Sequence, residues 1–517
     1  MYVTSLVPQP PACYCLQGRW TSKKTMKRKP SLRMVVVALL VSLGGSFHFG
    51  YQLVITNPAQ SGFMQFLNES LQSELHITAS DNALSQIWSF IVAILFLGAL
   101  AGSFSIRLVA DRIGRKQGLY VSTAIGVISA GLSVGSKFIP SVIMYSVSRV
   151  TMGFSVSLSL GLAALFLSES SPKECRGAIG MITGTCVQFG TVVGSVIAMP
   201  QVLGTYDLWP YIYVSEIAMM LVCVTFFPLL PETPGFLVQR GALEAAKKSL
   251  KFYYKCNDEA ADQHLSHIKE EQKRYTKVYT MTDVMKKGSL RKKTFIGMVV
   301  MFAMSFSGVS VINAYAVEIL LSTGLNSLEA SLANVGIALV SVFAIVISSM
   351  VVDKFGRRPL LLMAFMGCLI CNLLIFALML SFDKLGYHII GFILIFVICV
   401  FIIFFAIGPG PLCYFITAEL VGQAARSGAQ SWASVVQMLC RFVIVTIFLP
   451  MKNGIGESWS YLILFVAPVI ASIIFLYFKL PETKNKTPIE VDEAAAKLPT
   501  IFSTKSRGQM NITSIKL

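Results

Sequence analysis

Three short charged motifs each occur twice along this chain, in the same order and at nearly constant separation. Asp111–Lys116 (Asp-Arg-Ile-Gly-Arg-Lys) recurs 242 residues later as Asp353–Arg358 (Asp-Lys-Phe-Gly-Arg-Arg). A glutamate seven residues before an arginine, and a Pro-Glu-Thr triplet, each recur 250 residues later, at Glu169 and Glu419 and at 231–233 and 481–483. Each motif follows an apolar run. Chance can repeat one motif but hardly three in one order, so the sequence predicts two similar halves.

The composition indicates that both halves lie in a membrane. Charged residues make up 13% of the 517 residues and hydrophobic residues 55%, whereas soluble proteins are about 25% charged. Twelve apolar runs approach the roughly 20 residues that cross a bilayer. They lie at 34–56, 86–109, 118–136, 139–166, 179–199, 208–230, 294–318, 330–352, 359–381, 388–413, 427–449 and 459–480. We therefore expect an all-α membrane protein with twelve transmembrane helices in two six-helix pseudo-repeats.

The spans divide the chain into five parts. These are a basic N-terminal tail (1–33), a six-helix bundle (34–230), a linker with short amphipathic helices (231–293), a second bundle (294–480) and a C-terminal tail (481–517). The 11 cysteines are scattered without metal-ligand spacing, so we expect neither a metal site nor a cofactor.

Lysine and arginine predict the orientation, because they concentrate in cytoplasmic loops. One set of loops holds three of them (Lys137, Lys384 and Lys452), whereas the other set holds 24 and the two chain ends hold seven each. Both termini are therefore expected in the cytoplasm, and the membrane is expected to be the plasma membrane. The net charge of +17 then reflects orientation and attraction to anionic lipid, not nucleic-acid binding. The sequon at Asn68 falls in the outer loop 57–85, where glycosylation is expected; a second sequon at Asn511 falls inside.

These motifs resemble those of the major facilitator superfamily and, within it, the sugar porter family of facilitative glucose and fructose transporters. The likeness covers nearly the whole chain between its tails. It includes the D-R-x-G-R-R elements at 111–116 and 353–358, the E-x-S-P…R-G element at 169–177, the P-E-S-P-like and P-E-T-K elements at 231–234 and 481–484, and a broken tenth helix at 408–411. The resemblance implies a transporter that works by alternating access, and no enzymatic activity.

Eight charged residues at the inner helix ends are candidates for a gate. The family uses such ion pairs to lock the cytoplasmic side while the substrate site faces outward. Partly exposed pairs contribute about 0–1 kcal/mol each, so several are needed. The basic and acidic candidates are Arg115, Arg176, Arg357 and Arg426, with Glu169, Glu232, Glu419 and Glu482. The alternative is that the basic residues only orient the chain, which does not explain why the acids recur at matched positions.

The sequence Gly408-Pro409-Gly410-Pro411 cannot continue a regular helix, because proline lacks the N–H and clashes with the preceding turn. A bend at this position suits a moving outer gate. A static kink is the alternative interpretation.

The family binds sugar with glutamine and asparagine from four spans and a tryptophan from the tenth, and this chain keeps only part of that set. Gln188 retains the fifth-span glutamine, while the seventh-span Q-Q-L-S-G-x-N reads Met304 to Ser310 here and has no amide. Asn313, one turn further on, is a partial replacement or a helix-packing residue. The candidate substrate residues are Gln188, Ser305, Ser310, Asn313, Ser341, Tyr414, Gln437 and Arg441.

Arg441 departs most from the family, which has a neutral asparagine there. A charge inside a span usually faces the bundle interior and marks a functional site. Three interpretations stay open: pairing with Glu216 or Glu318, contact with an anionic or strongly polar substrate, or extension of the side chain toward the membrane edge.

Proton-coupled relatives carry an aspartate directly after an F-G-Y-like sequence in the first span. Here Gln52 follows Phe49-Gly50-Tyr51, and glutamine cannot release a proton, which favours uniport; His48 is a nearby titratable group with a structural role as its simpler interpretation. We expect a facilitative uniporter of a hexose or similar small polar solute, whose partners are that solute and the bilayer. The alternatives are a porter of an organic anion or polyol that uses Arg441, a non-transporting sugar sensor, and a proton symporter.

Overall fold

The computed structural model describes residues 31–484 except 77, 173–174, 275–278, 353–354 and 422–424, together with 490–491. The described residues form helices and connecting turns, with no strand among them. Within these ranges, eleven helical segments are long and apolar enough to cross a membrane, and a twelfth results if the bent pair α1 and α2, with a 41° bend, is one span. The predicted all-α membrane fold with twelve spans is confirmed.

The first half contains the six spans expected between 34 and 230. The first span is the bent pair, and a further helix, α3, stands between it and the second span. The bounds are α1 (Leu32–Leu43), α2 (Ser46–Val54), α3 (Gln60–Leu75), α4 (Asp81–Arg112), α5 (Arg115–Phe138), α6 (Val142–Ser170), α7 (Arg176–Ile197), α8 (Pro210–Phe226) and the 3₁₀ turn η1 (Phe227–Leu229).

The second half repeats this plan but breaks three of its spans. The seventh is α13 (Gly288–Ser305) with α14 (Val309–Ser322), the tenth is α17 (Ile389–Ile407) with α18 (Pro409–Val421), and the twelfth is α20 (Glu457–Tyr461), the π turn η3 (Leu462–Val466) and α21 (Ala467–Lys479). The unbroken spans are α15 (Ser327–Val352), α16 (Arg357–Leu385) and α19 (Arg426–Ile455).

Four short helices form the linker between the halves: α9 (Pro234–Gln239), α10 (Leu243–Tyr254), α11 (Asp258–Arg274) and α12 (Met281–Lys286). Helix α10 is tied to the first half. The Tyr253 hydroxyl donates to the Pro231 carbonyl at 2.6 Å, and the Arg33 guanidinium donates to the Phe252 carbonyl at 3.3 Å. The first described residues of the chain therefore lie beside the linker.

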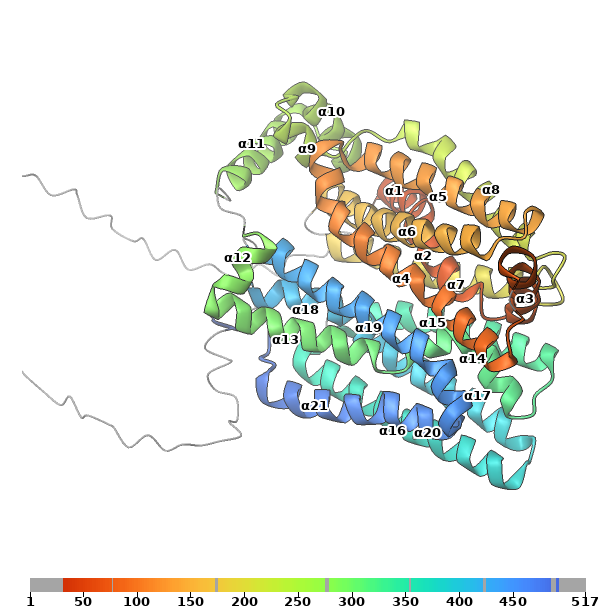
Figure 1. Ribbon diagram of the computed structural model, residues 1–517. Helices are drawn as coiled ribbons and strands as arrows, with labels where there is room; N and C mark the ends of the chain where they lie inside the picture. The colour runs from red at the N-terminus through yellow and green to blue at the C-terminus, as the bar shows by residue number, and fades with distance from the viewer. Residues whose placement is uncertain are drawn as a thin grey trace, which may run out of the picture.

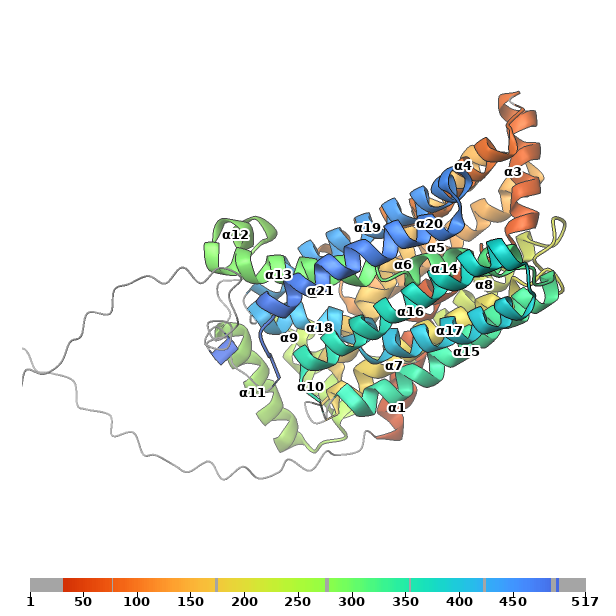
Figure 2. The same ribbon diagram turned by 90° about the horizontal axis from the view of Figure 1, so that it is seen from below.

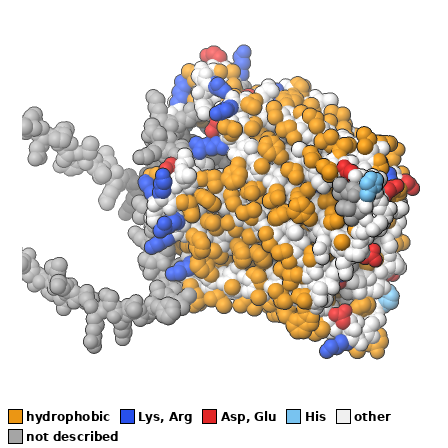
Figure 3. Space-filling view, viewed as in Figure 1, with side chains coloured by type: hydrophobic (Ala, Val, Ile, Leu, Met, Phe, Trp, Pro, Cys, Tyr) orange, Lys and Arg blue, Asp and Glu red, His pale blue; other side chains and the backbone are white. Residues whose placement is uncertain are grey.

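The long helices run along one common direction, with the linker helices at one end and α3 at the other (Figures 1 and 2). We call these the linker end and the α3 end. Lysine and arginine gather at the linker end in the space-filling view, and acidic residues and histidine at the α3 end (Figure 3). Hydrophobic side chains cover the wide band between them. This separation is the one that the loop counts predict for a bundle standing across a bilayer.

The break in the seventh span, which the sequence analysis did not predict, is stabilised by polar side chains. Gly308 adopts φ +106°, a backbone conformation that residues other than glycine disfavour. The Asn372 amide donates to the freed Ser307 carbonyl at 2.8 Å, and the Tyr461 hydroxyl donates to Asn372 Oδ1 at 3.1 Å. Broken backbone persists at membrane depth only where such partners satisfy it.

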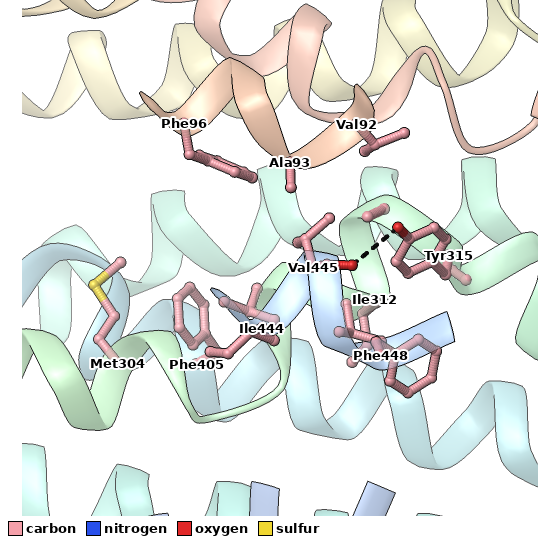
Figure 4. Packing of buried hydrophobic residues seen from close by; sticks show 14 of the residues in the cluster. Val92, Ala93, Phe96, Met304, Ile312, Tyr315, Phe405, Ile444, Val445 and Phe448 are labelled. Atoms are coloured by element: carbon pink, nitrogen blue, oxygen red, sulfur yellow. Dashed lines mark hydrogen bonds between the residues drawn. The ribbon is translucent and has the colours of Figure 1, made fainter. Parts of the chain in front are cut away.

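The two halves pack directly on each other along α4 and α19. Val92, Ala93 and Phe96 of α4 face the α19 segment that carries Val445 (Figure 4). All are at least 95% buried. The Tyr315 hydroxyl of α14 donates to the Val445 carbonyl at 3.2 Å, which ties the seventh span to the same segment.

Candidate functional site

A cavity of about 2550 Å³ lies between the two halves. Its wall contains residues of α2, α4, α6 and α7 from the first half and of α13, α14, α15, α17, α18 and α19 from the second. It runs from the centre of the bundle to the linker end, where Arg107, Asp111 and His264 line it. Small-molecule pockets usually measure about 300–1,000 Å³, so this space comprises a central site together with a wide entrance.

Hydrogen bonds between the halves close the α3 end. Asn57, which follows α2, donates to the Asn313 carbonyl at 3.2 Å and to Asn334 Oδ1 at 3.4 Å, and it accepts from the Val317 N–H at 3.0 Å. Gln60 donates to Glu318 at 2.6 Å. The cavity is thus open toward one end of the bundle and sealed at the other.

Most of the predicted substrate residues line the cavity. They are Gln188, Asn313, Ser341, Tyr414, Gln437 and Arg441. The Gln437 amide donates to the Tyr414 hydroxyl at 2.7 Å and so fixes both side chains. Gln188 Oε1 accepts from the Thr191 hydroxyl at 3.4 Å, and its amide nitrogen has no partner among the residues described. Neutral donors and acceptors of this kind can exchange hydrogen bonds with a hydroxylated solute.

The three predicted serines differ in their surroundings. Ser305 lies outside the cavity wall, fully buried, and donates to the Met301 carbonyl at 3.0 Å; its geometry is that of a helix-packing residue. Ser341 lines the cavity and donates to the Ile337 carbonyl at 3.2 Å. Ser310 lines a small adjoining space, and its hydroxyl has no partner within the described part of the chain.

Arg441 is 6% exposed and lines both the cavity and the small adjoining space. Its guanidinium stands over the Phe96 ring, 5.9 Å from the centroid. The two acids considered as its partners are bonded elsewhere. Glu216 accepts from Gln52 at 2.6 Å, and Glu318 pairs with Lys452 at 2.8 Å.

A buried polar chain beside the site was not predicted. Arg149 of α6, 1% exposed, donates to Gln52 Oε1 at 2.8 Å, and the Gln52 amide donates to Glu216 Oε2. His48 Nδ1 lies 3.6 Å from Glu216 Oε1. The signal for Arg149 was present in the sequence, because it is, like Arg441, a charge within an apolar span.

Asn334 of α15 is a second residue that the sequence analysis missed. It lines the cavity and donates to the Ser195 hydroxyl of α7 at 3.2 Å. It lies seven residues before Ser341 and therefore on the same helix face. An asparagine in an otherwise apolar helix was the available signal.

The predicted gate residues form matching clusters, one in each half. Arg115 bonds Glu169 at 2.8 Å, and Glu169 accepts from the Thr233 hydroxyl at 2.7 Å. In the second half Arg357 lies 3.7 Å from Glu419, which accepts from the Thr483 hydroxyl.

The repeated Pro-Glu-Thr glutamates bind backbone rather than arginine side chains. Glu232 accepts from the Lys116 N–H at 3.0 Å, and Glu482 accepts from the Arg357 N–H at 2.9 Å. Each carboxylate thus caps the first turn of a span, where the helix dipole favours negative charge. These bonds, like the ion pairs above, join groups of the same half. Arg426 lines the cavity, and the side chain of Arg176 lies outside the described residues, as do Asp353 and Lys354 of the second motif.

The predicted hinge coincides with a break between two helices. α17 ends at Ile407, Gly408 has φ −115° and ψ −85°, and α18 begins at Pro409. A Cβ on Gly408 would lie 2.2 Å from the Ala364 Cβ, so α16 passes too close for a larger residue. Gly410 and Pro411 line the cavity. Whether the break moves stays a prediction.

The predicted glycosylation site lies in helix α3 at the α3 end. Asn68 is half-buried and Ser70, the sequon hydroxyl, is fully buried. Glu69 accepts from the Tyr206 hydroxyl, so α3 packs on the loop before α8. Modification of Asn68 stays a prediction.

Comparisons with known proteins agree with this architecture. The sequence model of the family described as "Sugar (and other) transporter" matches residues 37–495. Facilitated glucose transporter member 3 of sheep is 29% identical over 463 residues, which is 89% of this chain and 92% of the relative. The rat protein of the same description is 30% identical over 473 residues, 91% of this chain and 94% of its own length.

The solved structures with a similar fold include the xylose transporter XylE of E. coli in a partially occluded, inward-open conformation. It has a TM-score of 0.73 and 22% identity, and the match covers 88% of this chain and all of that one. XylE described as a proton:xylose symporter bound to 6-bromo-6-deoxy-D-glucose matches with a TM-score of 0.69 and 22% identity over 89% of this chain and 99% of that one. The relatives are transporters and not enzymes. With a family match over nearly the whole length and a two-half bundle around a central cavity, the chain belongs to the sugar (and other) transporter family of the major facilitator superfamily.

Proposed function

We propose that this protein is a facilitative uniporter that moves a hexose or a similar small polar solute down its gradient by alternating access. The central cavity carries the proposal, because neutral hydrogen-bonding side chains from both halves line it and one of its ends is open. A site between two repeats is accessible from each side in turn when the repeats rock against each other. No cofactor enters this mechanism.

The basic linker end is the cytoplasmic one in this proposal, and the membrane is the plasma membrane. Both tails then lie in the cytoplasm, and Asn68 lies outside, where it is open to glycosylation. The conformation described above is accordingly the inward-facing one. The five parts of the chain act as two rocking bundles, 34–230 and 294–480, joined by the linker 231–293 and flanked by the tails.

The solute is bound by side chains at the closed end of the cavity. Gln188, Asn313, Gln437 and Tyr414 offer amide and hydroxyl groups, and Ser310, Ser341 and Asn334 lie beside them. A buried polar group that loses its partner costs about 1–3 kcal/mol, so a solute with fewer hydroxyl groups binds more weakly. Ser305 contributes to helix packing instead.

The charged clusters at the linker end stabilise the ends of the spans in this conformation. When the linker end closes, Arg115, Arg357 and Arg426 approach the acids of the opposite half and form new pairs. Each pair contributes little, so the set biases the equilibrium without locking it. The break at Gly408–Pro411 lets α17 and α18 change their mutual angle.

Uniport follows from Gln52. It occupies the centre of the polar chain between Arg149 and Glu216, with bonds of 2.8 and 2.6 Å. An amide there keeps the chain hydrogen-bonded without carrying a proton across.

Uptake into proteoliposomes tests the proposal. The purified chain is reconstituted and screened with radiolabelled hexoses, pentoses and polyols, with and without a pH gradient. We expect saturable uptake that the gradient leaves unchanged, and a half-saturation concentration about tenfold higher in Gln188→Ala, the loss that one to two kcal/mol of hydrogen bonding gives. Gln201→Ala, at an exposed glutamine of the α3 end, is the control. Saturable binding without flux would indicate a sensor, and flux driven by the pH gradient would indicate a symporter.

A further inference from the structure

Arg441 brings a buried positive charge to the central cavity, and the described residues supply no acid to neutralise it. Its guanidinium stands over the Phe96 ring, and its Nε has no hydrogen-bond partner within the described part of the chain. Burying an unpaired charge is costly. A residue of this kind in a binding cavity indicates a ligand of opposite charge.

The acids of the neighbourhood are already engaged. Glu216 bonds Gln52 at 2.6 Å and lies 3.6 Å from His48, and Glu318 bonds Lys452 and Gln60. The acidic side chains on the cavity wall, Asp111 and Glu169, stand at the linker end beside Arg115, within 3.7 and 2.8 Å of it.

The second arginine of the region, Arg149, does not add a further free charge. It donates to Gln52, whose amide donates to Glu216, so Arg149 and Glu216 offset each other through one glutamine. At the closed end of the cavity the described residues therefore leave one positive charge, on Arg441, while Arg107, Lys255 and Arg426 line the linker end. That count suits a monoanion better than a dianion such as a phosphate monoester, which carries close to two charges at neutral pH.

Neutral polar groups surround this charge. The small space beside Arg441 is also lined by the neutral groups of Gln52, Ser310 and Asn313 and by Arg149, the arginine offset by Glu216. The Ser310 hydroxyl has no partner among the described residues. Gln437 lies one turn before Arg441 on the same helix, and Gln188 faces the same cavity from α7. The site thus combines one cation with several neutral donors and acceptors.

We infer that the site accepts a hexose-sized, polyhydroxylated monocarboxylate, that is, a sugar acid. This inference rests on the proposed transport function and specifies its substrate class. The guanidinium binds the carboxylate through two parallel N–H···O bonds, a geometry that lysine cannot supply. The hydroxyl groups bind the neutral side chains, and the Phe96 ring holds the guanidinium by a cation–π contact.

A comparison of the uptake of two solutes, one charged and one neutral, tests this inference. Proteoliposomes with the full chain are assayed with radiolabelled D-glucuronate and D-glucose, using wild type, Arg441→Asn, Arg441→Lys and the control Arg291→Asn, which removes an exposed arginine outside the cavity. We expect Arg441→Asn to lower glucuronate uptake at least about tenfold, which is the effect of losing one charge-assisted hydrogen bond. Glucose uptake should change less than about threefold, which is the effect of losing one neutral hydrogen bond. Arg441→Lys retains part of the glucuronate uptake, and Arg291→Asn retains all of it.

The membrane potential gives an independent readout. An inside-negative potassium diffusion potential opposes the entry of an anion, so it slows glucuronate uptake by wild type and leaves glucose uptake unchanged. Glucose flux without glucuronate flux in wild type overturns the inference and leaves the proposed uniport intact. Flux of neither solute, with the screen above also negative, defeats the proposed function itself. Equal loss of both solutes in Arg441→Asn, restored equally by Arg441→Lys, assigns Arg441 a structural role and overturns the inference.

Discussion

Asn57 inserts its side-chain amide into the hydrogen-bond ladder of α14, and this contact predicts how the α3 end opens. In a regular helix the Val317 N–H donates to the Asn313 carbonyl. Here Tyr315 between them has φ −140° and ψ 16°, the Val317 N–H donates to Asn57 Oδ1, and Asn57 Nδ2 donates to the Asn313 carbonyl. A side chain of the first half thus replaces one backbone bond of the second half.

Replacing Asn57 by alanine should therefore favour the conformation that is open at the α3 end. Three bonds are lost, including that to Asn334, at about 1 kcal/mol each, and the Val317–Asn313 bond re-forms and returns about one. The net cost of about 2 kcal/mol changes the ratio of the two conformations about 30-fold. A protein that is about 97% open at the linker end would then be open about half of the time.

Double electron–electron resonance between spin labels measures this ratio. Labels at Ile113 and Phe355, which are 46% and 51% exposed, report the separation of the halves at the linker end in a cysteine-free background. Asn57→Ala should raise the short-distance population, whereas Asn326→Ala should not, because Asn326 caps α15 within one half by accepting from the Glu329 N–H at 2.9 Å. Identical distance distributions in Asn57→Ala and wild type would refute this reasoning.

Three further predictions concern single contacts. Asn372→Ala leaves the Ser307 carbonyl without its donor and should cost about 1–3 kcal/mol, seen as a lower thermal unfolding midpoint in detergent; an unchanged midpoint would show that water replaces the amide. Glu169→Gln and Glu419→Gln should slow sugar uptake in liposomes to a similar degree, because the two clusters match, and an effect confined to one half would contradict that. Burial raises the pKa of the Tyr253 hydroxyl in the folded protein. The resulting contribution to stability is fully present below the unfolded pKa of about 10, and it is lost as the pH rises toward the higher folded pKa. The free energy of chemical unfolding should therefore depend more on pH above pH 10 in wild type than in Tyr253→Phe.

The fold could be predicted because bilayer thickness and loop charge restrict a chain of twelve apolar runs so strongly. The break at Gly408 was predictable from two prolines, since proline removes a backbone donor wherever it stands. The break at Gly308 was not, because a single glycine is tolerated within a helix. Its stabilisation by Asn372 joins residues 65 positions apart, and local sequence carries no information on that pairing.

The candidate site was predictable where one side chain faces a cavity, and less so where side chains pair. Gln188 and Gln437 line the cavity, and their part in binding solute stays a prediction. The partners of Glu216 depend on how α2, α6 and α8 meet, and those of Glu318 on how α14 meets α3 and α19. Pairing of either acid with Arg441, one of the three open interpretations, did not form. Arg149 and Asn334 are absent from the predicted set, although each is a strongly polar side chain within an apolar span, which is a sequence signal for a site in itself.

Two label pairs in the same wild-type protein test the central claim of alternating access most directly. One pair, at Ile113 and Phe355, spans the linker end; the other, at the exposed positions Val202 and Leu385, spans the α3 end. The account predicts a reciprocal change: whenever saturating solute raises the short-distance population at the linker end, the long-distance population at the α3 end rises with it. Distances that lengthen together at both ends, or a linker end that never closes while solute is transported, would contradict it.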